Sequence, residues 1–116
     1  MDLHNCRALI TGSSRGIGRA TALALAEHGC RIGINYYRHP DAAEATAAAV
    51  RQRGGEAITL PGDVAKKKEA EAMVSCFLDA FGGIDVLVNN AGMNIPGTIT
   101  TLTDEAWERA LGVHLS

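Results

Sequence analysis

The glycines near the start of the chain have a spacing that can bind phosphate. They lie in the stretch Thr11-Gly12-Ser13-Ser14-Arg15-Gly16-Ile17-Gly18, between the apolar run 8–10 and an alanine- and leucine-rich segment, 19–27. This order predicts a strand, a tight glycine turn and a helix. Such a turn presents free backbone N–H groups and the positive end of a helix dipole to an anion. We therefore predict the phosphate-binding turn of a nucleotide cofactor site.

Each glycine of this stretch has a different expected role. Gly12 permits the sharp reversal after the strand, where a side chain would cause strain. Gly16 lets a pyrophosphate approach the backbone, and Gly18 lets the helix lie close against the sheet. The spacing is G-x-x-x-G-x-G rather than the commoner G-x-G-x-x-G, and a flexible surface loop is the alternative for glycines alone. The flanking strand and helix favour the binding motif.

Strands and helices are predicted to alternate along the chain. Apolar runs predict strands at 7–11, 30–35, 56–60 and 84–88, and helical periodicity predicts helices at 19–28, 41–53, 66–81 and from about 103. In the second helix Asp41 and Glu44 have the spacing of a capping box. Connections of this length between strands are typical of parallel crossovers, so we expect a doubly wound α/β sheet in one domain or part of one.

Composition excludes several classes of function. The chain has 116 residues and a net charge of -2, which gives no reason to expect nucleic-acid binding. Residues 66–68 form a basic run, which we expect to be the exposed first turn of a helix. No apolar run approaches the ~20 residues of a membrane span, and the N-terminus lacks a signal-peptide pattern. We expect a soluble cytoplasmic protein.

The three cysteines do not predict a metal site or a disulfide framework. Cys6, Cys30 and Cys76 are far apart in the sequence, odd in number and lack C-x-x-C spacing. We expect buried or half-buried free thiols, and we predict no metal ligands.

Four features in order resemble one known family. They are the glycine stretch 11–18, Asp63-Val64 after the third strand, Asn89-Asn90-Ala91-Gly92 after the fourth, and a helix containing Trp107 that ends in Gly112-Val113-His114-Leu115. Together they resemble the N-terminal half of a classical short-chain dehydrogenase/reductase. Residues 11–20 are especially similar to the 3-oxoacyl-carrier-protein reductase branch.

The resemblance covers essentially the whole chain and implies its fold. It implies a Rossmann-like doubly wound parallel sheet, truncated to about four strands in the order 3-2-1-4. Residues 1–116 would then be the NADP-binding N-terminal portion of a single domain.

The resemblance also implies cofactor contacts. Pyrophosphate and adenosine ribose would lie on Gly12, Ser13, Ser14, Arg15, Gly16, Ile17 and Gly18. Asp63 would bind the adenine amino group and Val64 would meet the ring, while Asn90, Ala91 and Gly92 would line the ribose and nicotinamide side. The alternatives are a helix N-cap for Asp63 and a turn signal for Asn89-Asn90. Their position after the carboxyl ends of strands favours the site.

The loop after the second strand favours NADP(H) over NAD(H). NAD sites of this architecture place an acid about 20 residues beyond the glycines, but this position falls near Tyr36 and no acid lies in 31–40. Tyr36, Tyr37 and Arg38 form the expected cofactor loop, and Arg15 and Arg38 can flank a 2′-phosphate. One charge-assisted hydrogen bond contributes roughly 1.5–3 kcal/mol, which is about a ten- to hundredfold preference. The alternative is that both arginines are merely exposed.

We predict no catalytic residue in this chain. The family uses a Tyr-x-x-x-Lys pair and a Ser further along, whereas Tyr36 and Tyr37 are followed four residues later by Pro40 and Asp41. His114 stands where the resemblance implies Asn, either as a polar substitute or as a helix-end residue without a catalytic role.

Two classes of function follow from these residues. The first is a carbonyl reductase or alcohol dehydrogenase seen as its cofactor half, inactive alone. The alternative is a non-catalytic dinucleotide-binding or interaction module, or an inactive truncated product. Strand 84–88 would be an unpaired edge in this piece, so we also expect self-association.

Overall fold

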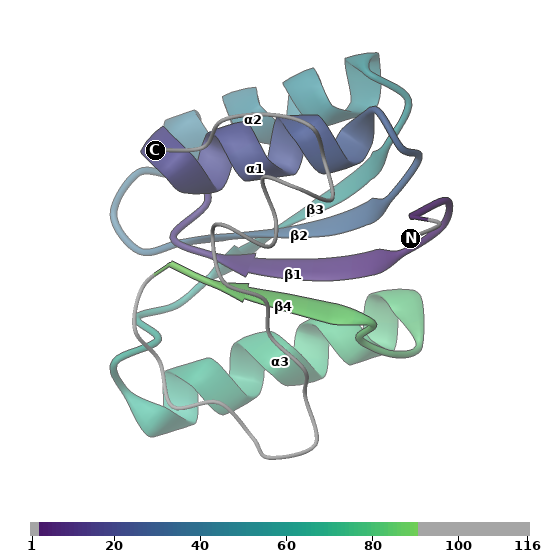
Figure 1. The fold of residues 1–116 in the computed structure, drawn as a ribbon. Coiled ribbons are helices and arrows are strands. Elements are labelled where there is room, and N and C mark those ends of the chain that lie inside the picture. Colours follow the sequence, from purple (N-terminus) through teal and green to yellow (C-terminus); the bar gives the residue numbers. More distant parts are fainter. Residues whose placement is uncertain (1–2, 91–116) are drawn as a thin grey trace.

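The computed structural model describes residues 3–90, which form a four-stranded parallel sheet covered by helices on both faces (Figure 1). The sheet order is β3-β2-β1-β4, as predicted. The elements in chain order are β1 (Arg7–Thr11), α1 (Gly16–Ala26), β2 (Arg31–Tyr36), α2 (Pro40–Gln52), β3 (Glu56–Pro61), α3 (Lys67–Phe81) and β4 (Val86–Asn89). The helix expected from about 103, with Trp107 and His114, lies outside the described residues.

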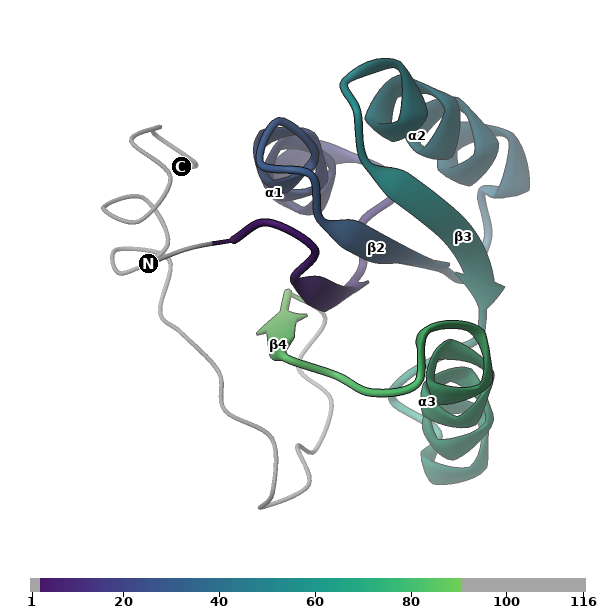
Figure 2. The same ribbon diagram turned by 90° about the vertical axis from the view of Figure 1, so that its right-hand side faces the viewer.

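Two apolar layers hold the sheet between its helices. α1 and α2 cover one face and α3 covers the other, as Figure 2 shows. Alternate residues of β1 enter opposite layers: Ile10 packs on the α1–α2 side and Leu9 on the α3 side with Phe77. All three side chains are fully buried. Burial on both faces explains why the sequence of this strand is a continuous apolar run.

The buried face of α1 differs from the predicted one. The helical periodicity of the sequence predicts a single inward stripe, made of Ile17, Ala20, Thr21, Ala24, Leu25 and His28. Ile17 is instead 41% exposed, whereas Gly18, Thr21, Ala22, Leu23, Leu25 and Ala26 are buried. The helix contacts α2 as well as the sheet, so it buries a wider arc than one stripe.

The capping box predicted for α2 is wrong. The helix begins at Pro40, with His39 as N-cap and no side-chain cap. Proline suits this first position because its missing N–H has no helical partner there. Glu44 instead accepts a hydrogen bond from the Thr59 hydroxyl of β3, at 3.0 Å.

The predictions for α3 are confirmed. Ala70, Met73 and Phe77 are buried, and Val74 and Phe81 pack against the same layer. The helix ends at Phe81 and is capped by Gly82, whose φ of 80° lies in the left-handed region. The lysines 66–68 are exposed.

The thiols are mostly as predicted. Cys30 is buried and Cys6 half-buried, but Cys76 is exposed on α3, against the prediction. Within residues 3–90, no helix has the length and apolarity to cross a membrane, and no three His, Cys, Asp or Glu side chains are grouped to hold a metal ion.

Candidate cofactor site

A pocket of about 570 Å³ opens at the carboxyl ends of β1, β2 and β3. In open α/β sheets this edge is where ligands bind. Its lining combines the glycine turn, the end of β2 with its loop, and the turn after β3. The lining residues are Gly12, Ser14, Arg15, Gly16, Asn35, Tyr36, Tyr37, Arg38, His39, Gly62, Asp63, Val64 and Ala65.

The glycine turn has the geometry that its sequence requires. Gly12 and Gly16 both have φ of 61°, in the left-handed region that favours glycine. A Cβ added at Gly16 would meet nothing within 4 Å, so the backbone there is open to a ligand. A Cβ at Gly18 would overlap the Gly12 carbonyl oxygen and lie 2.7 Å from the Ser13 Cα. Gly18 is therefore required by the turn itself, not only by contact of the helix with the sheet.

Asn35 holds the glycine turn in place. Its Oδ1 accepts a hydrogen bond from the Gly12 N–H at 3.0 Å, and its carbonyl oxygen accepts one from the Ser13 N–H at 3.1 Å. Its Nδ2 donates to the carbonyl oxygens of Leu60 and Gly62, both at 3.2 Å. This side chain is 2% exposed. Asn35 thus ties the turn after β1 to the turn after β3.

The hydrogen bonds of Asn35 decide which amides remain for an anion. The Gly12 and Ser13 N–H groups point into the protein, and the Ser13 hydroxyl donates to the Ile10 carbonyl at 2.8 Å. The first amides of a helix have no intrahelical partner, and the side chain of the N-cap residue, Arg15, makes no capping bond. The N–H groups at the start of α1, from Gly16 onward, are therefore the ones placed to bind a phosphate.

Two arginines supply positive charge to the pocket. Arg15 comes from the glycine turn and Arg38 from the loop after β2. The Arg38 guanidinium carbon lies 4.9 Å from the centroid of the Tyr37 ring, a cation–π contact that holds the side chain over the loop. Within residues 3–90, neither arginine is in an ion pair with a carboxylate. Their charge is available to a ligand.

Asp63 lines the pocket, but it is not the N-cap of α3. That position belongs to Lys66, so the helix-cap alternative is wrong. Asp63 Oδ1 accepts a hydrogen bond from the Ala65 N–H at 3.0 Å, and the Asp63 N–H donates to Glu69 Oε1 at 3.1 Å. These bonds shape a tight turn that keeps Asp63 and the buried Val64 beside the pocket.

The asparagines at the carboxyl end of β4 brace β1. The Asn90 N–H donates to the Thr11 hydroxyl at 2.9 Å, and that hydroxyl donates to Asn89 Oδ1 at 3.2 Å. Asn90 is exposed and is not among the pocket-lining residues. Ala91 and Gly92 lie outside the described residues.

The structure brings most of the predicted residues to one pocket. Ser13 and Gly18 lie behind the turn, and Ile17 faces solvent beside it. Sequence reasoning missed Asn35. The feature that could have identified it is its polar side chain near the end of an otherwise apolar strand. Sequence reasoning also missed Thr11 as the bonding partner of the β4 end.

Sequence comparison relates this chain to short-chain dehydrogenases. The family model described as short chain dehydrogenase matches residues 7–116. A 3-oxoacyl-[acyl-carrier-protein] reductase of Synechocystis is 42% identical over 109 residues, which are 94% of this chain and 44% of that protein. The chain spans less than half the length of the curated relatives it matches.

Solved structures agree in fold. A short chain dehydrogenase from Burkholderia cenocepacia in complex with NADP is 40% identical with a TM-score of 0.74, over 84% of this chain and 40% of that one. An NADH-dependent reductase complexed with NAD is 39% identical with a TM-score of 0.74, over 84% and 43%. The glycine turn, the sheet order and these matches together show that the chain belongs to the short-chain dehydrogenase/reductase family of oxidoreductases.

Proposed function

We propose that this chain binds NADP(H) and is the cofactor-binding portion of a reductase or dehydrogenase that transfers hydride between the nicotinamide and a carbonyl or alcohol substrate. The proposal rests on two arginines, Arg15 and Arg38, that have no carboxylate partner within residues 3–90 and lie at a pocket whose β2 loop has no acid. A 2′-phosphate needs such positive charge, whereas the ribose hydroxyl of NAD is usually bound by a carboxylate.

The residues of the pocket fit this cofactor. Free amides at the start of α1 suit the pyrophosphate, and the open space at Gly16 lets it approach the backbone. Tyr36, Tyr37 and Asp63 surround the place for the adenosine. NADP(H), when bound, supplies the hydride, and the chain's own residues bind and orient it. Asn90, Ala91 and Gly92 stay predicted contacts on the nicotinamide side.

The choice of cofactor is tested by titrating the chain with NADPH and NADH in separate fluorescence or calorimetric experiments. We expect tighter binding of NADPH. Arg38→Ala should weaken NADPH binding about ten- to hundredfold, the value of one charge-assisted bond, and leave NADH binding unchanged.

Arg53→Ala is the matched control, because Arg53 is exposed and pairs with Glu27, away from the pocket. It should change neither affinity. Equal affinity for the two cofactors, or tighter NADH binding, would contradict the proposal.

A second candidate is a non-catalytic dinucleotide-binding module. It is favoured by the absence of a Tyr-x-x-x-Lys pattern from these 116 residues. For this chain alone we propose binding without turnover, so consumption of NADPH with a carbonyl substrate would exclude the module. Self-association through β4, one domain over residues 1–116 and a cytoplasmic location remain predictions.

A further inference from the structure

Two cysteines lie side by side at the amino ends of β1 and β2. Arg7 pairs with Arg31 in the parallel register, so Cys6 and Cys30 directly precede paired residues. The Arg31 N–H donates to the Cys6 carbonyl at 2.8 Å, which extends the pairing to this point. Adjacent strands lie about 4.8 Å apart, within the range of Cα separations that a disulfide spans.

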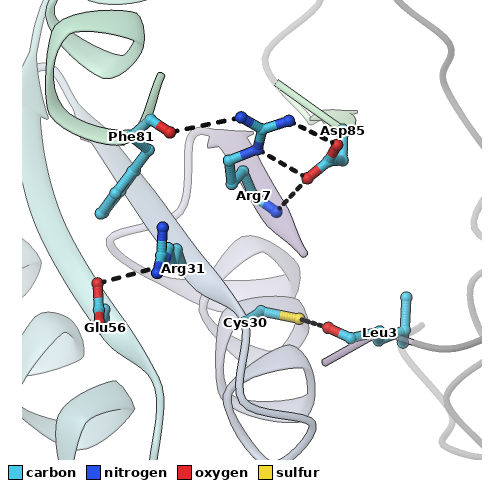
Figure 3. A network of polar contacts seen from close by, with 7 residues as sticks. All are labelled: Leu3, Arg7, Cys30, Arg31, Glu56, Phe81 and Asp85. Carbon is cyan, nitrogen blue, oxygen red and sulfur yellow. Dashed lines mark hydrogen bonds and ion pairs between the residues drawn. The ribbon is translucent and has the colours of Figure 1, made fainter. Parts of the chain in front are cut away.

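Both thiols face the same apolar layer. Cys30 is part of the layer under α1 and α2, and Cys6 packs against it. The Cys30 thiol donates a hydrogen bond to the Leu3 carbonyl oxygen at 3.2 Å (Figure 3). A third cysteine, Cys76, is exposed on α3, on the opposite face of the sheet.

We infer that Cys6 and Cys30 are a site of oxidative modification, at which a hydroperoxide converts the two thiols into one intrachain disulfide. The Cys6 thiolate attacks the peroxide, the O–O bond breaks, and Cys6 becomes a sulfenic acid while an alkoxide or hydroxide leaves and takes up a proton from water. The Cys30 sulfur then attacks the Cys6 sulfur. The S–S bond forms, the S–O bond breaks, and the oxygen leaves as water with the Cys30 proton.

The surroundings assign the order of these steps. Cys6 is half-buried, so it meets the oxidant, whereas Cys30 is buried. Burial raises the pKa of Cys6, with a further increase from Asp85 that Arg7 opposes. Burial, followed by the nearby Cys6, raises the pKa of Cys30 to about 12. Because the thiolate is the nucleophile, these raised pKa values make the reaction slow at neutral pH.

The cross-link would join β1 to β2 across the segment that binds the phosphate. The loop it closes, residues 6–30, contains the glycine turn and all of α1. A disulfide that closes a loop restricts the unfolded chain and so stabilises the folded one. The thiols lie at the opposite end of the strands from the pocket, so cofactor affinity should be unchanged.

The experiment uses the full chain with Cys76→Ser, which removes cross-linking between copies through the exposed thiol. The folded protein is treated with hydrogen peroxide at pH 8.5. We expect loss of both thiols, a mass lower by two hydrogen atoms, a peptide map that joins Cys6 to Cys30, and a higher melting temperature that falls back on reduction.

Two variants serve as matched controls. Cys6→Ser and Cys30→Ser, each in the Cys76→Ser background, should lose no hydrogen mass under the same treatment. The inference is overturned if both thiols survive peroxide that oxidises the urea-unfolded chain. It is also overturned if Cys6 proceeds to a sulfinic acid while Cys30 stays free.

Discussion

The two ends of the same sheet are built in opposite ways. At the carboxyl ends of the strands, hydrogen bonds to backbone groups hold the turns around an open pocket, with Asn35 at their centre. At the amino ends, charged side chains pair with each other and close the surface. The difference separates the end that can receive a ligand from the end that holds the sheet together.

The amino end is closed by Arg7 and Asp85. The Arg7 N–H donates to Asp85 Oδ2 at 2.8 Å, and the guanidinium makes two further bonds to the same carboxylate, both at 3.0 Å (Figure 3). A Cβ at Gly83 would lie 2.6 Å from Arg7 Nη1, so the glycine leaves room for the guanidinium. These bonds join β1 to the segment before β4.

The two ends differ in whether their arginines have carboxylate partners. The charge of Arg7 is neutralised by Asp85, and the Arg31 guanidinium lies 3.6 Å from Glu56. Arg15 and Arg38 at the other end have no carboxylate partner among residues 3–90. A ligand with several phosphates would supply the missing negative charge only at the pocket end.

The largest expected effect comes from Gly18→Ala at the pocket end. Its Cβ would overlap the backbone of Gly12 and Ser13, so the turn and α1 must separate. We expect a loss of about 3 kcal/mol or more in the free energy of unfolding and no measurable NADPH binding. Urea unfolding and an NADPH titration measure these effects.

Gly54→Ala is the control for backbone strain alone. Gly54 has φ of 98° and open space around it, in the turn between α2 and β3. The Gly54→Ala variant should have a lower free energy of unfolding and unchanged NADPH binding. A Gly18→Ala protein as stable as this control would refute the close contact between turn and helix.

A smaller effect is expected from Asn35→Ala. The change removes the acceptor of the Gly12 N–H and the donor to the carbonyl oxygens of Leu60 and Gly62, at a cost of about 1–3 kcal/mol for a group left unsatisfied. NADPH affinity should fall as well, because the turn is no longer held. Differential scanning calorimetry and the same titration measure the two losses.

Asn35→Asp sharpens this test. It keeps the oxygen that accepts from Gly12 but removes the donors to Leu60 and Gly62, and it adds a negative charge next to the phosphate site. We therefore expect Asn35→Asp to reduce the free energy of NADPH binding more than it reduces the free energy of unfolding. Unchanged affinity in both variants would show that Asn35 does not position the turn.

The smallest effect is expected at the amino end, from Asp85→Asn. Hydrogen bonds from Arg7 lower the pKa of Asp85 below its ordinary value of 3.8. A carboxyl with a lowered pKa contributes stability above its unfolded pKa and loses it as the pH falls through the folded pKa. The variant should melt a few degrees lower at pH 7, with NADPH binding unchanged, and the difference should vanish in acid.

Glu56→Gln is the control, because its ion pair is more exposed and longer and such pairs contribute little. Melting curves are measured from pH 7 down to about 2.5, below the ordinary carboxyl pKa. They compare each of the two variants with the unchanged chain. A difference for Asp85→Asn that stays constant as the pH falls would mean that its effect is not ionic.

The sequence by itself determined the fold and the place of the site. Apolar runs covered on both faces predicted the strands, and the glycine spacing predicted the turn, because glycine adopts the left-handed φ of Gly12 and Gly16 without strain. Connections long enough to hold a crossover helix favoured a parallel sheet. These signals are local, so they can be read along the chain.

Only the tertiary structure decided which groups hold the site together. Asn35 bonds to residues 23 and 27 positions away, Gly12 and Gly62, and the Arg7–Asp85 pair spans 78 positions. The width of the buried face of α1 depended on its contact with α2, and the Cys6–Cys30 pair on strand register. None of these follows from periodicity, because each depends on which segments the folded sheet places next to one another.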